Sequence, residues 1–292
     1  MSNWEEKFSR ALGRNDVARA VRELETMATD HAGTPPSAIK SRAVRMLRQH
    51  IPAGELPDIA VQLAGMPSPT AKELACALLA PAYTKRPAST LRIMIRLADD
   101  PNWEVRESAA GLFASVLEAA FGKAYPVFAD LTAHESPNVR RAVAVGVKYV
   151  GKLRRPEYGP PLLALLERLL PDPDPYVRKN LGPFALGDGL LRAYPELVLE
   201  HLEQWADQEN EMVRWNVAMC LSAAEARRHL PRILPLLHRL AADERRLVWR
   251  AVASAIRNHV KKMPAELSPI IRQWQDDPQR AHVAEVVVSR KG

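Results

Sequence analysis

The chain has 292 residues, of which 47% are hydrophobic and 26% charged, an ordinary composition for a soluble globular protein. Its formal net charge of +7 favours polyanionic partners. The sequence has no long uninterrupted apolar stretch and no basic, apolar leader at its start, so we expect neither membrane insertion nor secretion. These features predict a cytoplasmic protein.

The first part of the chain precedes the regular pattern described below. Residues 1–66 are predicted to form N-terminal capping repeats, with an earlier copy of that pattern within residues 37–48. Cys76 and Cys220 lie in helical segments, far apart, and neither has a second Cys or His at ligand spacing. We therefore expect buried, reduced thiols, no metal site and no cofactor.

A short phrase recurs along residues 67–292. It consists of a polar or proline-containing turn, an apolar residue that is usually Val, and then Arg, and it opens a helix with apolar periodicity. Its copies are anchored at positions 71, 105, 139, 177, 213 and 248, and a last copy lies near His282-Val283. The separations of 34, 34, 38, 36 and 35 residues are close to the period of HEAT and armadillo repeats.

Each phrase is predicted to open the second helix of a pair. The first helices are expected at residues 89–97, 161–170, 196–205 and 233–240. In the copy that begins at Val139, valines at 139, 143, 147 and 150 form one helical stripe, which a single pair cannot bury. We therefore predict an all-α fold without sheet, a HEAT-like repeat α-solenoid of about seven stacked helix pairs that forms one array over residues 1–292.

The arginine of the phrase has a structural explanation. In such arrays, an Arg early in the second helix pairs with an acidic residue of a neighbouring turn, and Asp99, Asp100, Asp172, Asp174 and Asp243 are suitably placed. Because the Arg recurs in nearly every repeat, we expect this structural role for Arg106, Arg178 and Arg214. Functional residues should instead appear as departures from the repeat.

The first departure is the segment Asn102-Trp103-Glu104-Val105-Arg106-Glu107. Trp103 stands in the turn, and Glu107 lies four residues later on the same helical face. A functional role for the two residues is one interpretation, and a packing Trp beside a solvated Glu is the other.

The second departure is a run of cations in residues 140–155 that contains no acidic residue. Six cations and Tyr149 occur there, and a similar run without acids covers residues 245–262. Such patches are typical of surfaces that bind polyphosphates, and the two could flank one groove. A solvated surface remains the alternative. The six cations are Arg140, Arg141, Lys148, Lys152, Arg154 and Arg155.

The third departure lies in residues 177–188. Gly182-Pro183 within a helix predicts a kink, because proline removes a backbone hydrogen bond. Gly187 and Gly189 then flank Asp188. The segment is interpreted either as part of a site or as a structural bend of the array.

At these three places the chain resembles the bacterial alkylpurine DNA glycosylases of the AlkD and AlkC type, over about residues 70–260. Residues 102–107 are similar to the AlkD-type Asn-Trp-Asp-x-Val-Asp segment. The resemblance implies that Trp103 is an active-site aromatic residue and that Glu107 is the catalytic carboxylate. It also implies that Arg140 and Arg141, followed by Lys148 and Tyr149, lie beside the damaged nucleotide. Residues 177–182 are similar to the third helix of the family, and residues 188–205 to an AlkC-type segment.

The sequence departs from the family pattern at two positions. The family's catalytic Asp is Glu107 here, which is one methylene longer. A second active-site Trp, expected after Gly182, is replaced by Pro183-Phe184. Phe184 could supply the missing ring, and Asp188 is a second candidate for the catalytic carboxylate.

The resemblance predicts a monomeric DNA glycosylase that excises N3- or N7-alkylated purines from double-stranded DNA by hydrolysis, without base flipping. Such a purine is already cationic, so a carboxylate that stabilises positive charge on the sugar suffices. A catalytically silent DNA-binding paralogue and a protein-binding HEAT scaffold are the alternatives. The predicted DNA-binding residues are Arg140, Arg141, Lys148, Tyr149, Lys152, Arg178, Lys179, Phe184, Arg214, Trp215 and Arg250.

Overall fold

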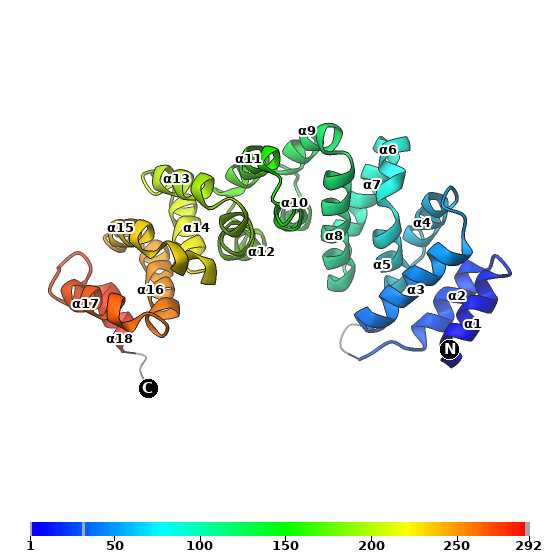
Figure 1. Cartoon of the computed structure of the whole chain (residues 1–292), viewed down its shortest axis with the longest axis horizontal. Coiled ribbons are helices and arrows are strands. Elements are labelled where there is room, and N and C mark those ends of the chain that lie inside the picture. Colours follow the sequence, from blue (N-terminus) through cyan, green and yellow to red (C-terminus); the bar gives the residue numbers. More distant parts are fainter. Residues whose placement is uncertain (1, 31–32, 290–292) are drawn as a thin grey trace. The chain divides into compact units, whose positions relative to one another are not determined.

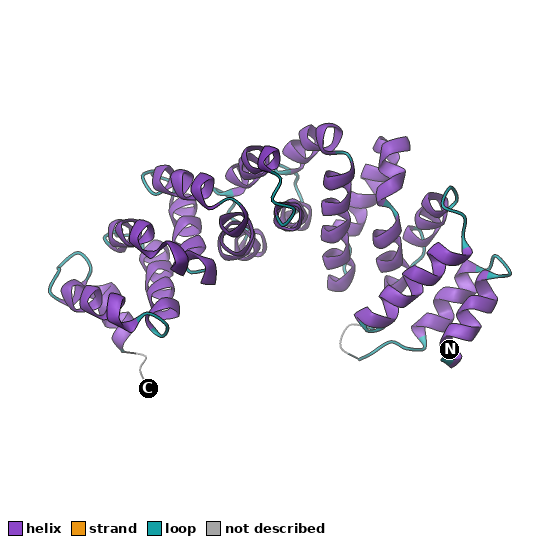
Figure 2. Ribbon diagram, viewed as in Figure 1, coloured by secondary structure: helices purple, strands orange, loops and turns teal. Residues whose placement is uncertain are grey.

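A computed structural model describes residues 2–30 and 33–289 of the chain. Every regular element in these residues is helical and none is a strand, which confirms the predicted all-α class (Figure 2). No helix in this part of the chain is both long and apolar enough to cross a bilayer. The chain divides into two compact units, Met1–Gly146 and Val147–Gly292, which are described separately below. The predictions of one continuous array, and of capping repeats over residues 1–66, stay predictions.

In its described residues the first unit contains nine whole helices, which Figure 1 labels, and most of a tenth, α10. The boundary between the two units falls within α10. Second helices of successive pairs pack against one another, as α5 does against α8. The helices are α1 (Asn3–Leu12), α2 (Val17–Glu25), α3 (Ser37–His50), α4 (Leu56–Ala64), α5 (Pro69–Leu78), α6 (Ala80–Lys85), α7 (Pro87–Ala98), α8 (Trp103–Ala119), α9 (Phe121–Leu131) and α10 (Pro137–Gly151).

The second unit continues the same arrangement. Helix α14 packs against η2 on one side and α16 on the other, and α16 packs against α18. Its elements are η1 (Pro156–Tyr158), α11 (Gly159–Leu169), α12 (Pro175–Asn180), η2 (Leu181–Leu191), α13 (Pro195–Trp205), α14 (Glu211–Leu221), η3 (Ala224–His229), α15 (Leu230–Ala241), α16 (Arg246–Val260), α17 (Pro264–Gln275) and α18 (Ala281–Val288).

The turn before each second helix explains why the recurring phrase begins a helix. Asn102, Asp174 and Asn210 are N-caps whose side-chain oxygens accept hydrogen bonds from the first free backbone N–H groups of α8, α12 and α14. The valine of the phrase is then buried, as Val105 and Val139 are. The phrase therefore encodes a cap followed by the first core residue.

The arginines of the phrase bind the turns between helices, either through backbone carbonyls or through an acidic side chain. Arg106 donates hydrogen bonds to the backbone carbonyls of Asp100 and Pro101, which lie in its own turn. Arg214 pairs with Asp243 of the following turn, at 2.8 Å. The structure thus gives both arginines the predicted structural role, although Arg106 reaches it through backbone oxygens.

Gly182-Pro183 forms part of a π-helix, η2, where the sequence predicted a kink. A Cβ atom at Gly182 would lie 2.9 Å from the Asn216 carbonyl oxygen, and one at Gly187 would lie 2.5 Å from the Ala223 Cβ. The two glycines are five residues apart, which is the hydrogen-bond step of a π-helix, so both face α14 and its C-terminal turn. Close packing against α14 and its C-terminal turn therefore accounts for glycine at these two positions.

Both cysteines are free and buried, as the sequence predicted. Burial raises the pKa of the Cys76 and Cys220 thiols, which keeps them protonated and unreactive. They belong to the core and not to a site.

Candidate functional site

The first unit contains a cavity of about 560 Å³ that brings Trp103 and Glu107 together. Its walls come from α3, α5 and α8, elements that are up to about 70 residues apart in the sequence. The lining residues are Ser37, Lys40, Ser41, Val44, Arg45, Arg48, Glu73, Leu74, Ala77, Trp103, Glu104, Glu107 and Ser108.

Helix α8 positions the two predicted active-site residues. Trp103 is its first residue and remains 46% exposed, an unusual value for so large an apolar side chain. Glu107 follows one turn later and forms an ion pair with Arg141 of α10. The Arg141 side chain is only 8% exposed, so a buried cation holds the carboxylate from one side. The carboxylate is therefore fixed in place at the cavity wall.

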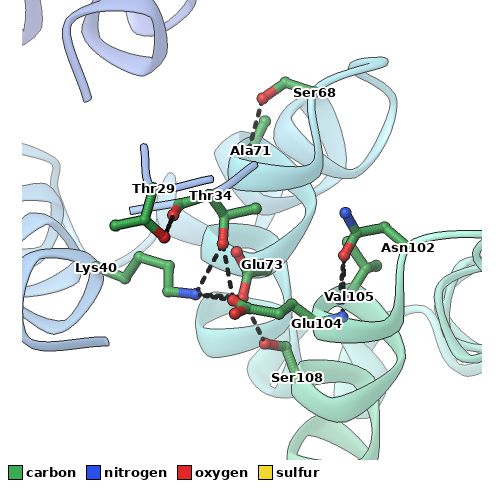
Figure 3. Close-up of polar contacts among 10 residues, drawn as sticks. All are labelled: Thr29, Thr34, Lys40, Ser68, Ala71, Glu73, Asn102, Glu104, Val105 and Ser108. Carbon is green, nitrogen blue, oxygen red and sulfur yellow. Dashed lines mark hydrogen bonds and ion pairs between the residues drawn. The ribbon is translucent and has the colours of Figure 1, made fainter. Parts of the chain in front are cut away.

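A second charged cluster lies in the same wall (Figure 3). The Lys40 ammonium donates to Glu73 at 2.6 Å and to Glu104 at 2.5 Å. Thr34 donates to Glu104 at 2.7 Å, and Ser108 donates to Glu73 at 3.2 Å. One lysine thus joins two carboxylates that are 31 residues apart in the sequence.

Burial and hydrogen bonding move the pKa values of these two carboxyls in opposite directions. Burial raises the pKa of Glu73, against the opposing effect of Lys40. Burial also acts on Glu104, but hydrogen bonds from Lys40 and Thr34 outweigh it and lower its pKa. One Glu73 carboxylate oxygen, Oε2, is buried and has no hydrogen-bond partner within the described part of the chain.

These features define what the cavity can do chemically. An exposed aromatic ring and several carboxylates favour a planar or cationic group. Glu107 can stabilise positive charge that develops on a sugar and can accept a proton from water. Arg45 and Arg48, both exposed on α3, stand at the same cavity and can contact an anionic backbone.

Three other predicted residues lie together in the second unit. Lys148, Lys152 and Asp188 line a separate cavity of about 290 Å³. The Lys148 ammonium lies 3.1 Å from the centroid of the Phe184 ring, so this ring is already covered by a cation. The Lys152 ammonium lies 4.9 Å from the centroid of the Tyr149 ring.

The remaining predicted residues occupy varied environments. Arg140 is half-buried and donates to the carbonyls of His134 and Glu135, in the manner of Arg106. The Arg178 guanidinium lies 5.1 Å from the Trp215 ring centroid, and Lys179 is exposed.

Trp215 and Arg250 lie at a further depression in the second unit. They line a third cavity, of about 650 Å³, together with Arg246 and Leu247. The assignment of all these residues to DNA binding stays a prediction, as does a single groove flanked by the two basic runs.

Sequence reasoning missed Lys40, Glu73 and Glu104 as cavity residues. Glu104 lies within the segment that the sequence singled out, but Lys40 and Glu73 belong to turns of helices with no distinguishing pattern. Lys40 contacts Glu73 and Glu104 across 33 and 64 residues of sequence, so no local pattern points to the cluster.

Comparison with known proteins identifies HEAT repeats in two overlapping segments, residues 90–181 and 162–257, which together span more than half of the chain. Among solved structures, AlkD2 from Streptococcus mutans is similar, with a TM-score of 0.54 and 20% identity over 70% of this chain and 97% of that one. The structure of smu.31 from Streptococcus mutans UA159 gives a TM-score of 0.51 and 19% identity over 73% and 97% of the two chains. No curated protein sequence matches. These matches confirm the predicted HEAT-like repeat α-solenoid and its likeness to AlkD-type proteins in fold.

Proposed function

The chain belongs to the HEAT-repeat family, and we propose that it uses this scaffold to bind duplex DNA and excise N3- or N7-alkylated purines. The observation that carries the proposal is the cavity of the first unit, in which exposed Trp103 and ion-paired Glu107 lie one helical turn apart. AlkD2 from Streptococcus mutans shares the fold of the scaffold. The two predicted active-site residues are thus available to one bound nucleotide.

The proposed reaction is hydrolysis of the glycosidic bond. An alkylated purine carries positive charge, so it takes the electron pair of the breaking C1′–N bond and leaves as a neutral base. Positive charge then develops on the deoxyribose, next to the Glu107 carboxylate. Water adds to C1′ and gives up its proton to Glu107, which leaves an abasic site in the DNA.

Trp103 contributes in a different way. Its ring can lie against the cationic base or sugar, an interaction worth about 0.5–2 kcal/mol. Because the purine is primed to leave, no acid is needed at the base. As the resemblance to the AlkD type implies, the base need not be extruded into a deep pocket.

Arg141 has two consequences for Glu107. It holds the carboxylate in position, and it also offsets part of its charge. The second effect favours an alternative function, a catalytically silent protein that binds the same DNA. The two functions differ in base release and not in DNA binding.

The experiment measures release of the alkylated base from a duplex that contains N7-methylguanine, with enzyme in excess. We expect Glu107→Gln to slow release by about 10²–10³-fold, since it keeps shape and hydrogen bonding but removes the charge. Glu118→Gln is the matched control, because Glu118 is exposed on the same helix. Binding of the duplex without base release by the wild type would support the silent protein instead.

Glu107→Asp tests the extra methylene. Faster release by this variant would mean that the longer side chain places its carboxylate too close to, or past, the productive position. Full activity of Glu107→Gln would contradict the assignment and direct the search to Asp188.

A further inference from the structure

The second unit contains a cavity whose wall is dominated by cations. It is bounded by the C-terminal part of α10, the loop that follows, and the C-terminal part of η2 with the residues after it. Its volume is about 290 Å³. Four cations and a single carboxylate line it. The lining residues are Lys148, Lys152, Arg154, Asp188, Gly189, Arg192 and Ala193.

Lys148 is the unusual member of this group. It is only 8% exposed, yet it forms no ion pair with any described residue. Its ammonium rests instead on the face of Phe184, at 3.1 Å from the ring centroid. A buried cation normally has an anionic partner, because desolvation is costly. The face of an aromatic ring offsets that cost only in part.

Packing holds Lys148 in this position. A Cβ atom at Gly189 would lie 3.0 Å from the Lys148 Cγ and 3.3 Å from its Cβ, so a larger residue there would force the lysine stem to shift slightly. Arg154 has φ +53°, a left-handed conformation that is uncommon for a residue other than glycine. That backbone turn places Arg154 at the cavity wall.

The other charges at the cavity leave it positive. Arg192 pairs with Glu225 at 3.1 Å, and Glu225 does not line the cavity. Asp188 is the one carboxylate in the wall, and it forms no ion pair within the described residues. Burial lowers the pKa of Lys148, Asp188 raises it, and Lys152 and Arg192 lower it further.

We propose that this cavity binds a phosphate group, with the Lys148 ammonium as its buried contact and Lys152 and Arg154 at its rim. A phosphate would supply the anionic partner that Lys148 lacks in the fold, and its oxygens would accept charge-assisted hydrogen bonds. The phosphate can belong to the DNA backbone or to a free phosphorylated molecule. Only the DNA source rests on the proposed glycosylase function.

The first test titrates inorganic phosphate into the full chain by calorimetry. The wild type should bind it saturably. Lys148→Met, which keeps the apolar stem, should weaken binding by at least about tenfold, the equivalent of 1.4 kcal/mol. Asp188→Asn should tighten it several-fold, because it removes the repelling charge. Lys123→Met, at an exposed position of α9, is the matched control and should leave the affinity unchanged.

Unfolding cannot weaken phosphate binding in Lys148→Met and also tighten it in Asp188→Asn. Opposite changes in affinity would therefore report binding and not stability. Absence of saturable phosphate binding by the wild type, or equal affinity in Lys148→Met, would overturn the proposal.

The second test distinguishes the source of the phosphate with an undamaged duplex. If the phosphate belongs to DNA, Lys148→Met should flatten the dependence of log affinity on log salt by about 0.9. Loss of phosphate binding with an unchanged salt slope would assign the cavity to a free phosphorylated molecule. Base release by the wild type is measured separately. If no base is released, the phosphate titration still tests the phosphate proposal.

Discussion

In the first unit each cavity carboxylate is matched by a cation of the same fold, whereas in the second unit the cavity cations outnumber their partners. Lys40 joins Glu73 and Glu104, and Arg141 holds Glu107. Lys148 has only an aromatic ring beneath it. Removal of one partner of a buried ion pair leaves an unpaired charge in the fold and is strongly destabilising, whereas removal of a buried cation that has no ion pair relieves its desolvation cost. The two cavities should therefore respond oppositely when a lysine is removed.

The largest expected effect is on the first unit. Lys40→Met leaves Glu73 and Glu104 without their common partner, so we expect the free energy of unfolding to fall by about 3 kcal/mol. Denaturant titration followed by circular dichroism measures this change. Lys148→Met should lower the free energy of unfolding by less than about 1 kcal/mol or should raise it, because no ion pair is lost. Equal destabilisation by the two variants would end the distinction between the cavities.

Removal of the cation that holds Glu107 should mainly affect the reaction rate. Arg141→Met frees the carboxylate to move, and misplacement of a reacting group by about 1 Å can cost about 10²-fold in rate. Single-turnover base release measures the effect. A faster reaction would mean that Arg141 restrains Glu107 by offsetting its charge, as the silent-protein alternative requires.

Trp103→Ala should have a smaller effect. Loss of a contact between the ring and a cationic nucleotide corresponds to about 0.5–2 kcal/mol, which is roughly a 2- to 30-fold slower release. The preference for alkylated over intact duplex should fall by a similar factor, as competition binding can show. Because Trp103 is 46% exposed, the stability of the protein should hardly change. A large loss of stability would identify Trp103 as a packing residue.

The smallest effect concerns pH. The pKa of Glu73 is raised above its ordinary value of 4.5 by burial, so the folded state holds this proton more tightly than the unfolded chain. Stability from Glu73 is therefore full below pH 4.5 and is lost as pH rises through the raised pKa. Glu73→Gln should flatten the pH dependence of the free energy of unfolding in that window. An unchanged slope would show that Lys40 keeps Glu73 ionised throughout.

Much of the fold was predictable because its signals are local. Within each copy of the phrase, the capping residue lies only a few positions before the buried valine, as Asn102 does before Val105. Asn210 caps another copy in the same way, so the pattern is visible in the sequence. The π-helix was not predictable in the same way. Gly182 and Gly187 reveal their purpose only beside α14, which lies some 30 residues later.

The candidate site was predictable in part. The pairing of Trp103 with Glu107 follows from helical spacing alone. The roles of the basic residues do not, since a run of cations in the sequence gives no information about burial. Arg141 is buried and pairs with Glu107, and Lys148 is buried as well. Both belong to a run of cations that suggests an exposed patch. Lys40 reaches Glu104 across 64 residues of sequence, a distance at which no spacing rule operates.

The most direct test measures the properties assigned to both cavities in one experiment. Base release and the salt dependence of duplex binding are measured for the wild type, Glu107→Gln and Lys148→Met. Glu107→Gln should slow release by about 10²–10³-fold and leave the salt slope unchanged, because it removes no phosphate contact. If the phosphate belongs to DNA, Lys148→Met should flatten the slope by about 0.9. Base release by Glu107→Gln at the wild-type rate would contradict the assignment of catalysis to the first cavity.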